Sequence, residues 1–184
     1  MPRSRPGHNG DRAWDRDGTR VCGGSEVVNV ADVPETAHWM KSVDIGAHPA
    51  GWLPNGIADV NHDGTGDLLW YNAATPDVDI WLLQNGAWSA SSDVGIHPPG
   101  YAISGTSDFN HDGTSDVLWF NPATRDTDIW LLSNGHWAGS TTIGTHPAGS
   151  QLVGVGDFDH NGVSDIMWRD LNTGHIDTWL LAYS

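Results

Sequence analysis

Three short acidic loops hold the residue types and spacing best suited to chemistry, at residues 59–67, 108–116 and 157–165. Each follows the pattern D-x-[DN]-x-[DN]-G-x-x-D. Oxygen side chains at loop positions 1, 3 and 5 can converge on one centre, and Gly at position 6 permits a sharp turn. Position 7 can add a backbone carbonyl, and position 9 another carboxylate. Hard oxygen ligands of this kind suit calcium better than zinc or copper, so the sequence predicts a calcium site in each loop.

The predicted calcium ligands occupy the same five positions in every loop. They are Asp59, Asn61, Asp63, Thr65 and Asp67; Asp108, Asn110, Asp112, Thr114 and Asp116; and Asp157, Asp159, Asn161, Val163 and Asp165. The residue at position 7 is expected to contribute its carbonyl oxygen. The third loop exchanges the Asn and Asp of positions 3 and 5, which preserves the number of carboxylates. We therefore expect about three calcium ions per chain.

A metal-free turn is the alternative interpretation of each loop, because Asp, Asn and Gly favour turns by themselves. Three copies with ligand-competent residues at positions 1, 3, 5 and 9 favour metal, since clustered carboxylates repel one another without a cation. An EF-hand is excluded, because it needs Glu at position 12 and a helix on each side. Position 12 is instead a tryptophan in every copy, namely Trp70, Trp119 and Trp168.

The elements that must position these loops belong to a repeat of 49 residues. The position-12 tryptophans recur at this interval, and so do three other series. These are Trp81, Trp130 and Trp179; Trp39, Trp88 and Trp137; and His48, His97 and His146, each followed by Pro. The register never shifts, so the copies contain no insertions. Three units, at about 39–87, 88–136 and 137–184, account for residues 38–184.

Each unit is predicted to form four short antiparallel strands. In the middle unit, the runs that favour strands are 101–109, 116–120, 128–132 and 137–143. The acidic loop separates the first two runs, and a turn at 122–125 separates the next two. Asn134-Gly135 then gives a strong hairpin signal before the last run. Turn signals at this spacing are typical of all-β folds.

The central runs also predict how the sheets pack. Residues 117–120 and 129–132 are apolar on both faces, whereas a sheet with one solvated face would alternate. Both faces of each sheet must therefore be covered, most simply by neighbouring copies. Stacked four-stranded sheets of about 40–50 residues are the blades of a β-propeller. We expect an all-β fold of three such blades, with the nine repeated tryptophans packed between them.

Three blades are too few for a ring, because propellers typically contain about 4–8 blades. The repeat opens with a fourth-strand segment at Trp39–Ile45 and closes with a third-strand segment at Ile176–Leu181. The opening segment can complete a blade whose first three strands lie at the other end of the repeat. We expect a homodimer that forms one six-bladed ring, or a higher oligomer. The alternative is closure within a longer parent chain.

Composition excludes several classes of partner. The chain has 184 residues, with 23 acidic and 8 basic side chains and a net charge of −15. This balance argues against binding to nucleic acid or to anionic lipid, and no apolar run approaches the length of a membrane span. Residues 1–24, with five Arg and the only cysteine, Cys22, are expected to be a disordered basic tail. Residues 25–37 are expected to be a linker before the repeat region at 38–184.

Histidines provide the strongest catalytic alternative. His48, His97 and His146 would repeat around the axis of a ring, where they could bind zinc or an anionic ligand as in a metal-dependent hydrolase or lyase. A rigid His-Pro turn is the favoured interpretation. The histidines at loop position 4 are expected to be surface groups: His62, His111 and His160. Recognised catalytic motifs are absent from the sequence, so we expect a protein that is not an enzyme.

A lectin is the second alternative. Trp52 and Tyr101 occupy equivalent positions in the first two units, where exposed rings could stack on sugars. The third unit has Ser150 at this position, which weakens the prediction. Adhesion or protein binding is therefore ranked first, glycan binding second and catalysis a distant third.

The acidic loop, followed by Asp116–Asn121 and then by 129–135 with its Trp-Leu-Leu and Asn-Gly segments, resembles the bacterial FG-GAP/VCBS-type repeats. These are related to the propeller blades of integrin α subunits. The resemblance covers about residues 38–184. It implies a calcium-stabilised propeller, secreted or at the cell surface, that serves adhesion or the binding of a protein or glycan ligand. It also implies that the loop positions named above are the calcium ligands.

Overall fold

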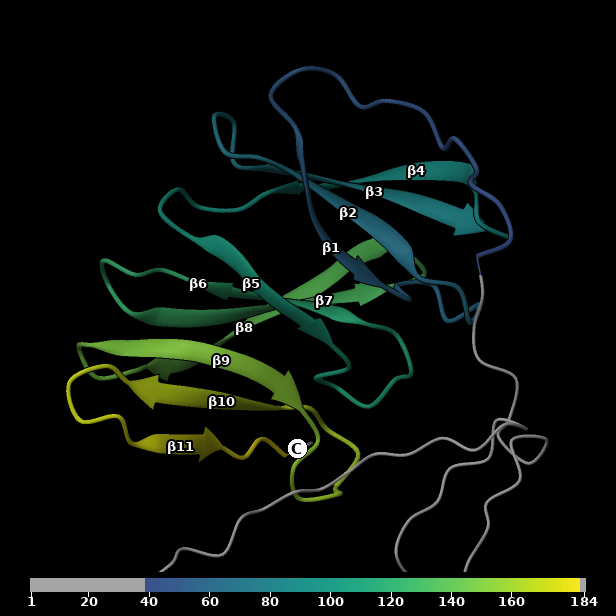
Figure 1. Ribbon diagram of the computed structural model, residues 1–184. Helices are drawn as coiled ribbons and strands as arrows, with labels where there is room; N and C mark the ends of the chain where they lie inside the picture. Colours follow the sequence, from purple (N-terminus) through teal and green to yellow (C-terminus); the bar gives the residue numbers. More distant parts are fainter. Residues whose placement is uncertain (1–38, 183–184) are drawn as a thin grey trace, which may run out of the picture. The chain divides into compact units, whose positions relative to one another are not determined.

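The computed structural model describes residues 39–182. The strands of the described residues all lie between Leu53 and Trp179 (Figure 1). Residues 39–182 form strands and turns and no helix. The predicted all-β class is therefore confirmed for this range. The predicted tail at 1–24 and linker at 25–37 lie outside the described residues.

The strands form three antiparallel sheets, each built from strands that follow one another in the chain. The first sheet consists of β1 (Leu53–Ala58), β2 (Asp67–Asn72), β3 (Asp77–Gln84) and β4 (Ala87–Ile96). The second consists of β5 (Ala102–Ser107), β6 (Asp116–Phe120), β7 (Asp126–Ser133) and β8 (His136–Thr145). The third consists of β9 (Ser150–Gly156), β10 (Asp165–Asp170) and β11 (Ile176–Trp179). The predicted strands of the middle unit are all present, and each acidic loop joins the first two strands of its sheet.

The outer hairpins of the first two sheets are copies of one another. Ile80 pairs with Ser92 in β3 and β4, and Ile129 pairs with Thr141 in β7 and β8. Both pairs of strands carry two bulges at equivalent positions. The Asn-Gly turns have positive φ at both residues (53° and 77°; 51° and 76°), as type I′ hairpins require. The repeat in sequence is therefore a repeat in strand register.

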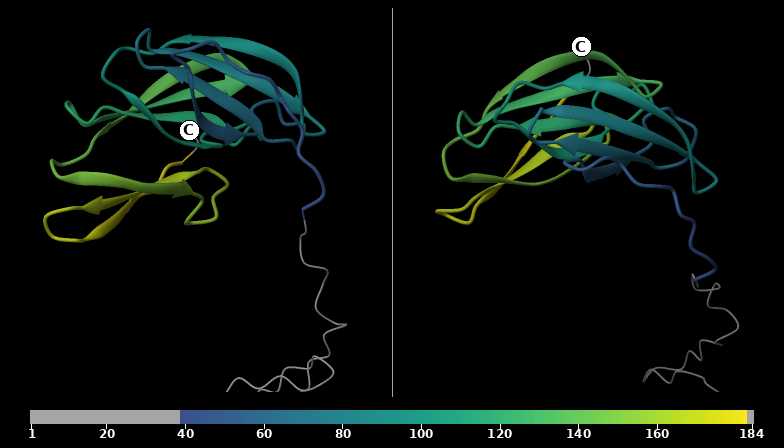
Figure 2. Two further views of the ribbon diagram at one scale, coloured as in Figure 1. Left: turned by 45° about the horizontal axis from the view of Figure 1, so that its top comes forward. Right: turned by 90° about the horizontal axis from the view of Figure 1, so that it is seen from above.

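The second sheet lies between the first and the third (Figure 2). Two apolar cores lie between the sheets, and the second sheet contributes to both. Val117 and Trp119 of β6 join the core shared with the first sheet. Leu118 of the same strand joins the core shared with the third sheet, opposite Ile166 and Trp168. Alternate residues of a strand point to opposite faces, so a continuous apolar run fits a sheet covered on both sides. The prediction that neighbouring copies cover each other is confirmed for the second sheet.

The prediction that all nine repeated tryptophans pack in the core is wrong for one series. Trp119 and Trp168 are fully buried, and Trp130 is 7% exposed. Trp88 and Trp137 are about half exposed, at 50% and 51%. They lie at the start of β4 and β8, next to the hairpin turn on the outermost strand. An edge strand has a neighbour on one side only, so a side chain there loses less contact with water. Trp39 of the same series is also exposed.

The third sheet differs from the expected four strands. It contains three, in the order β9, β10, β11. The predicted fourth-strand segment Trp39–Ile45 forms no strand among the described residues. A strand exists through hydrogen bonds to a neighbour, so a segment without a sheet to join has no ladder to form.

Candidate metal-binding loops

The three acidic loops share one backbone conformation. The histidine at position 4 is left-handed in each loop, with φ of 59°, 60° and 62° at His62, His111 and His160. The glycine at position 6 is left-handed as well, with φ of 81°, 85° and 87° at Gly64, Gly113 and Gly162. Left-handed backbone costs least for glycine, so glycine suits position 6, whereas the histidine at position 4 adopts this conformation despite its Cβ.

The carboxylate at position 1 holds the turn together. Asp59 Oδ1 accepts the backbone N–H of Asp63 at 3.1 Å, and Asp59 Oδ2 accepts that of Gly64 at 2.9 Å. Asp108 and Asp157 make the equivalent pairs of bonds in their own loops. The side-chain oxygen at position 3 also accepts the N–H of position 5 in every loop. Side-chain oxygens at positions 1 and 3 are thus turned toward the inside of the loop.

The carboxylate at position 9 has a structural role that the sequence did not reveal. Asp116 is fully buried; its Oδ2 accepts the N–H of Phe109 at 3.0 Å, and its Oδ1 accepts that of Leu132 at 2.9 Å. Asp67 and Asp165 are also fully buried and bond the equivalent N–H groups. Each position-9 carboxylate therefore ties its loop to the third strand or run of the same sheet, sixteen residues further along.

The third loop gathers its carboxylates more tightly than the other two. Among the described residues, Asp157, Asp159 and Asp165 place carboxylate oxygens within 4.8 Å of one another. In the first loop, Asp63 at position 5 instead accepts the N–H of Thr65 at 2.8 Å, and this bond holds the pKa of Asp63 below its usual range. The exchange of Asp and Asn between positions 3 and 5 thus changes which oxygens lie together.

The histidines at position 4 connect neighbouring loops. His62 Nδ1 donates to the carbonyl of Gly113 at 2.5 Å, and His111 Nδ1 donates to that of Gly162 at 2.7 Å. These side chains are exposed, as predicted for surface groups. Their contact with the next loop was not predicted, because it depends on the distance between two sheets. The loops therefore form a linked row along one edge of the three sheets.

The histidines of the His-Pro links lie inside aromatic cages. His97 is 1% exposed; its Nε2 donates to Asp128 at 3.1 Å, and its ring stacks on Trp119 at 4.1 Å between centroids. His48 and His146 make the equivalent bonds to Asp79 and Asp177. Each histidine is engaged within its own sheet, so the structure does not bring the three together at a shared centre.

Trp52 and Tyr101, the candidate sugar-stacking residues, belong to the same cages. The Trp52 ring lies 4.5 Å from the His48 ring, and the Tyr101 ring lies 4.6 Å from the His97 ring. In the third unit, Ser150 replaces the aromatic residue and its hydroxyl contacts His146 Nδ1 at 2.5 Å. The residue at this position therefore contacts the histidine in all three units. A serine can replace the aromatic residue because its hydroxyl makes that contact.

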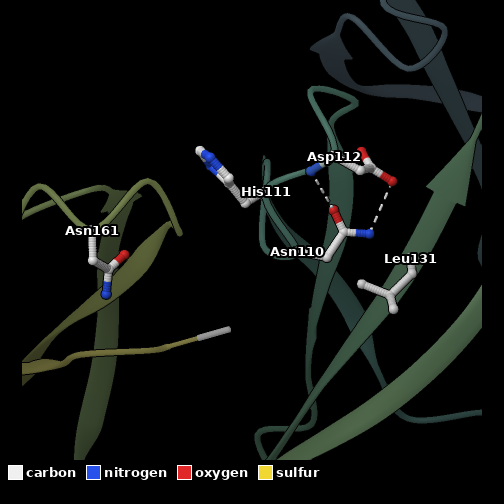
Figure 3. A pocket seen from close by; sticks show the side chains of 5 residues that line it. All are labelled: Asn110, His111, Asp112, Leu131 and Asn161. Carbon is white, nitrogen blue, oxygen red and sulfur yellow. Dashed lines mark hydrogen bonds between the residues drawn. The ribbon is translucent and has the colours of Figure 1, made fainter. Parts of the chain in front are cut away.

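A pocket of about 720 Å³ opens between the second and third acidic loops (Figure 3). Its lining residues are Asn110, His111, Asp112, Leu131 and Asn161. Asn110 and Asp112 are joined by two hydrogen bonds on one wall. The pocket thus combines oxygen-bearing side chains of two loops with one apolar residue.

Asp116 predicts a pH dependence for the metal-free protein. Burial raises the pKa of Asp116 to about 7, although the N–H bonds from Leu132 and Phe109 act in the opposite direction. Because the unfolded value is about 3.9, the contribution to stability is full below about pH 4 and is lost as pH rises through about 7. In chelator, the free energy of unfolding from urea titrations should fall between about pH 4 and pH 7, and less so in Asp116→Asn. Equal slopes in both proteins would contradict the assignment.

Comparison with known proteins agrees with the repeat architecture. No curated protein matches the chain. Among solved structures, a chain of the Photorhabdus luminescens Tc holotoxin pore is similar, with a TM-score of 0.53 and 20% sequence identity. The similarity covers 75% of this chain and only 6% of that one, so it supports the fold alone. The described residues include no helix long and apolar enough to cross a membrane. Residues 108–168 match the FG-GAP-like repeat, so the chain contains FG-GAP-like repeat sequence, as its resemblance to these repeats predicted.

Proposed function

We propose that the chain is a calcium-binding module of the β-propeller type, in which each sheet is a blade and each acidic loop holds one structural calcium ion. The observation that carries this proposal is the shared loop conformation, in which oxygen side chains at positions 1 and 3 turn inward in all three copies. The tight carboxylate group of the third loop supports it further.

The donor set fits calcium chemically. Position 1 provides a carboxylate in every loop, and positions 3 and 5 together provide one carboxylate and one amide. Position 9 adds a carboxylate that already accepts two N–H bonds, and position 7 adds a backbone carbonyl. Oxygen-only sets of this size suit a hard cation, whereas zinc prefers nitrogen and sulfur. The bound ion would supply positive charge among carboxylates that otherwise repel one another.

Calcium in these loops would act on stability rather than on reaction chemistry. Each loop connects the first two strands of a sheet, and its position-9 carboxylate reaches the third strand or run. An ion that fixes the loop therefore fixes three strands at once. The histidine links from His62 and His111 would pass this order to the neighbouring loop. We assign no catalytic role to any residue.

Binding of a protein ligand outside the cell or at its surface is the role we propose for the assembled module. Two features support it: the FG-GAP-like repeat sequence and the pocket between the second and third loops. Because Trp52 and Tyr101 pack against histidines, we expect a ligand to bind at the edge formed by the acidic loops rather than at those rings.

Calcium binding is tested by titration calorimetry and thermal melts of the full chain. We expect about three ions per chain and a melting temperature that rises with calcium. Each filled site should stabilise the fold by about 2.7 kcal/mol at a calcium concentration one hundred times its dissociation constant. Asp157→Asn should lose one ion, because it removes the position-1 carboxylate of the third loop.

The matched control is Asp93→Asn, which changes an exposed aspartate on β4 that lies outside the loops. It should leave the number of bound ions unchanged. A chain that binds no calcium and melts identically in calcium and in chelator would show that the loops are ordinary turns.

A further inference from the structure

Contacts between neighbouring sheets recur at the repeat interval. In the first series, the histidine at loop position 4 bonds the next loop, and among the described residues this series ends at the third sheet. His62 bonds the carbonyl of Gly113, and His111 bonds that of Gly162. The next donor in the series is His160, which is exposed. The acceptor with no histidine against it is Gly64 of the first loop, where an added Cβ would have nothing within 4 Å among the described residues.

A second series runs through glycines of the innermost strands and ends in the same way. A Cβ on Gly56 would lie 3.7 Å from Thr106, and one on Gly105 would lie 3.3 Å from Val155. A Cβ on Gly154, the third member, would have nothing within 4 Å in the part of the chain that the structure describes. The residue of the first sheet equivalent to Thr106 and Val155 is Ile57, which is 72% exposed. The open space beside Gly154 on the third sheet therefore matches the exposed side chain of Ile57 on the first sheet.

The third series is the set of outer strands. Among the described residues, β11 pairs with β10 and leaves its other edge unpaired. As a result, the side chain of Asp177 is 51% exposed, whereas its equivalents Asp79 and Asp128 are 17% and 14% exposed. Residues 39–46 have the sequence spacing of β4 and β8 but form no strand. Within residues 39–182, the third sheet therefore has no fourth strand, and the segment with a fourth-strand sequence joins no sheet.

An apolar groove of about 360 Å³ marks the place of the missing strand. Its lining includes Ile129 and Leu131 of β7, Thr141 and Ile143 of β8, and Leu181 beyond β11. At the junction of the first two sheets, β8 lies against β4. A fourth strand on β11 would lie against β8 in the same way and would cover this groove.

We infer that a second copy of this chain binds here: its residues 39–46 add to β11 as the fourth strand, and its first sheet packs on the third sheet of the first copy. His160 would then bond the Gly64 carbonyl of the second copy, and Ile57 of the second copy would cover Gly154. The register follows from the other two sheets, where Ile80 pairs with Ser92 and Ile129 with Thr141. The equivalent pair is Thr178 with Val43 of the second copy.

The interface joins two different surfaces of the chain. Copies linked in this way form a closed ring only if a whole number of them completes one turn around an axis. Two copies give six sheets, which lies within the usual range of about 4–8 blades, whereas three copies give nine. The structure favours a second copy over closure within one chain. His48 Nε2 bonds Asp79 of the first sheet at 2.9 Å, which keeps the end of the segment 39–46 at the first sheet. The second sheet separates the first sheet from the third, since it contributes to the core on each of its sides.

The first test measures the oligomeric state. Its result can be interpreted whether or not the loops bind calcium, because the mass is measured both in calcium and in chelator. Sedimentation equilibrium of the full chain, in calcium and in chelator, should give twice the chain mass of 19.8 kDa in at least the calcium buffer. A monomer in both buffers overturns the inference. Polymers that grow with concentration overturn ring closure by two copies.

Cross-linking tests the register. In a Cys22→Ser background, Val43→Cys and Thr178→Cys are made in separate proteins, which are then mixed and oxidised. Paired residues on antiparallel strands are close enough for a disulfide. The mixture should form a covalent dimer, while each single variant alone should form little. When both cysteines are placed in one chain, a cross-linked monomer would show closure within the chain and overturn the inference.

Gly154→Trp tests the contact between sheets without removing any existing contact. A Cβ at residue 154 would meet nothing within 4 Å among the described residues, whereas Ile57 of a second copy needs that space. We expect at least a tenfold weaker dimer with an unchanged circular dichroism spectrum. Ala123→Trp is the matched control, because Ala123 lies in an exposed turn of the second sheet, which has both neighbours already. Equal dimer strength in both variants would overturn the inference.

Discussion

Replacing Trp119 by alanine should lower the free energy of unfolding by about 3–5 kcal/mol, the usual cost of deleting a buried aromatic side chain. Trp119 is fully buried in the core between the first and second sheets. It stacks on His97 at 4.1 Å and meets Trp130 edge-on at 5.3 Å between centroids. Loss of the Trp119 ring opens a cavity. It also removes the stacking contact that holds the His97 ring in place for its hydrogen bond to Asp128. Urea denaturation followed by circular dichroism measures the change.

Trp137→Ala is the matched control, because it deletes the same side chain from an outer strand. Trp137 is 51% exposed, so its removal should cost less than half as much as the removal of Trp119. Both proteins must be compared at the same calcium concentration and in the same oligomeric state. Similar losses in the two variants would contradict the assignment of Trp119 to the core.

Asp116→Leu should cost about 2–6 kcal/mol, because it leaves two buried N–H groups without a partner, each worth about 1–3 kcal/mol. The N–H groups belong to Phe109 and Leu132, and both residues are buried. Asp116→Asn keeps one acceptor oxygen and should cost less. Measured in chelator, the difference between these variants reports the hydrogen bonds without any contribution from a bound ion.

Asp93→Leu provides the comparison for an exposed aspartate on an outer strand, where the expected change lies within about 0.5 kcal/mol. If Asp116→Leu were as mild as Asp93→Leu, the position-9 carboxylate would have no role in joining the loop to the third strand. Calcium would then be the main reason for an aspartate at this position.

Local features of this fold could be predicted from the sequence because they depend on neighbouring residues. The Asn-Gly turn requires two left-handed residues, and 134–135 provides them at the predicted place. The acidic loop requires glycine at position 6, and all three loops have the predicted turn. The apolar run at 117–120 predicted a sheet covered on both faces, which the two cores confirm. Repetition strengthened these predictions, since the Asn-Gly turn occurs twice and the acidic loop three times at the same interval.

Other features were decided by contacts between residues far apart in the chain. Trp88 and Trp119 both recur at the repeat interval, yet Trp88 lies on an edge strand and Trp119 lies between sheets. The bond from Asp116 to Leu132 depends on how β6 and β7 align. The bond from His62 to Gly113 depends on the spacing between two sheets.

The sequence by itself therefore determined the strands of the three sheets, the turns and the composition of the acidic loops, because short-range backbone preferences and apolar periodicity specify them. Tertiary structure alone decided which repeated residues are buried, which carboxylates lie together, and where each series of contacts between sheets ends. Equivalent residues in a repeat have the same local preferences but different neighbours, and neighbours determine burial and hydrogen bonding. His111 and His160 illustrate this: their loops are alike, but only the first has a following loop among the described residues to bind.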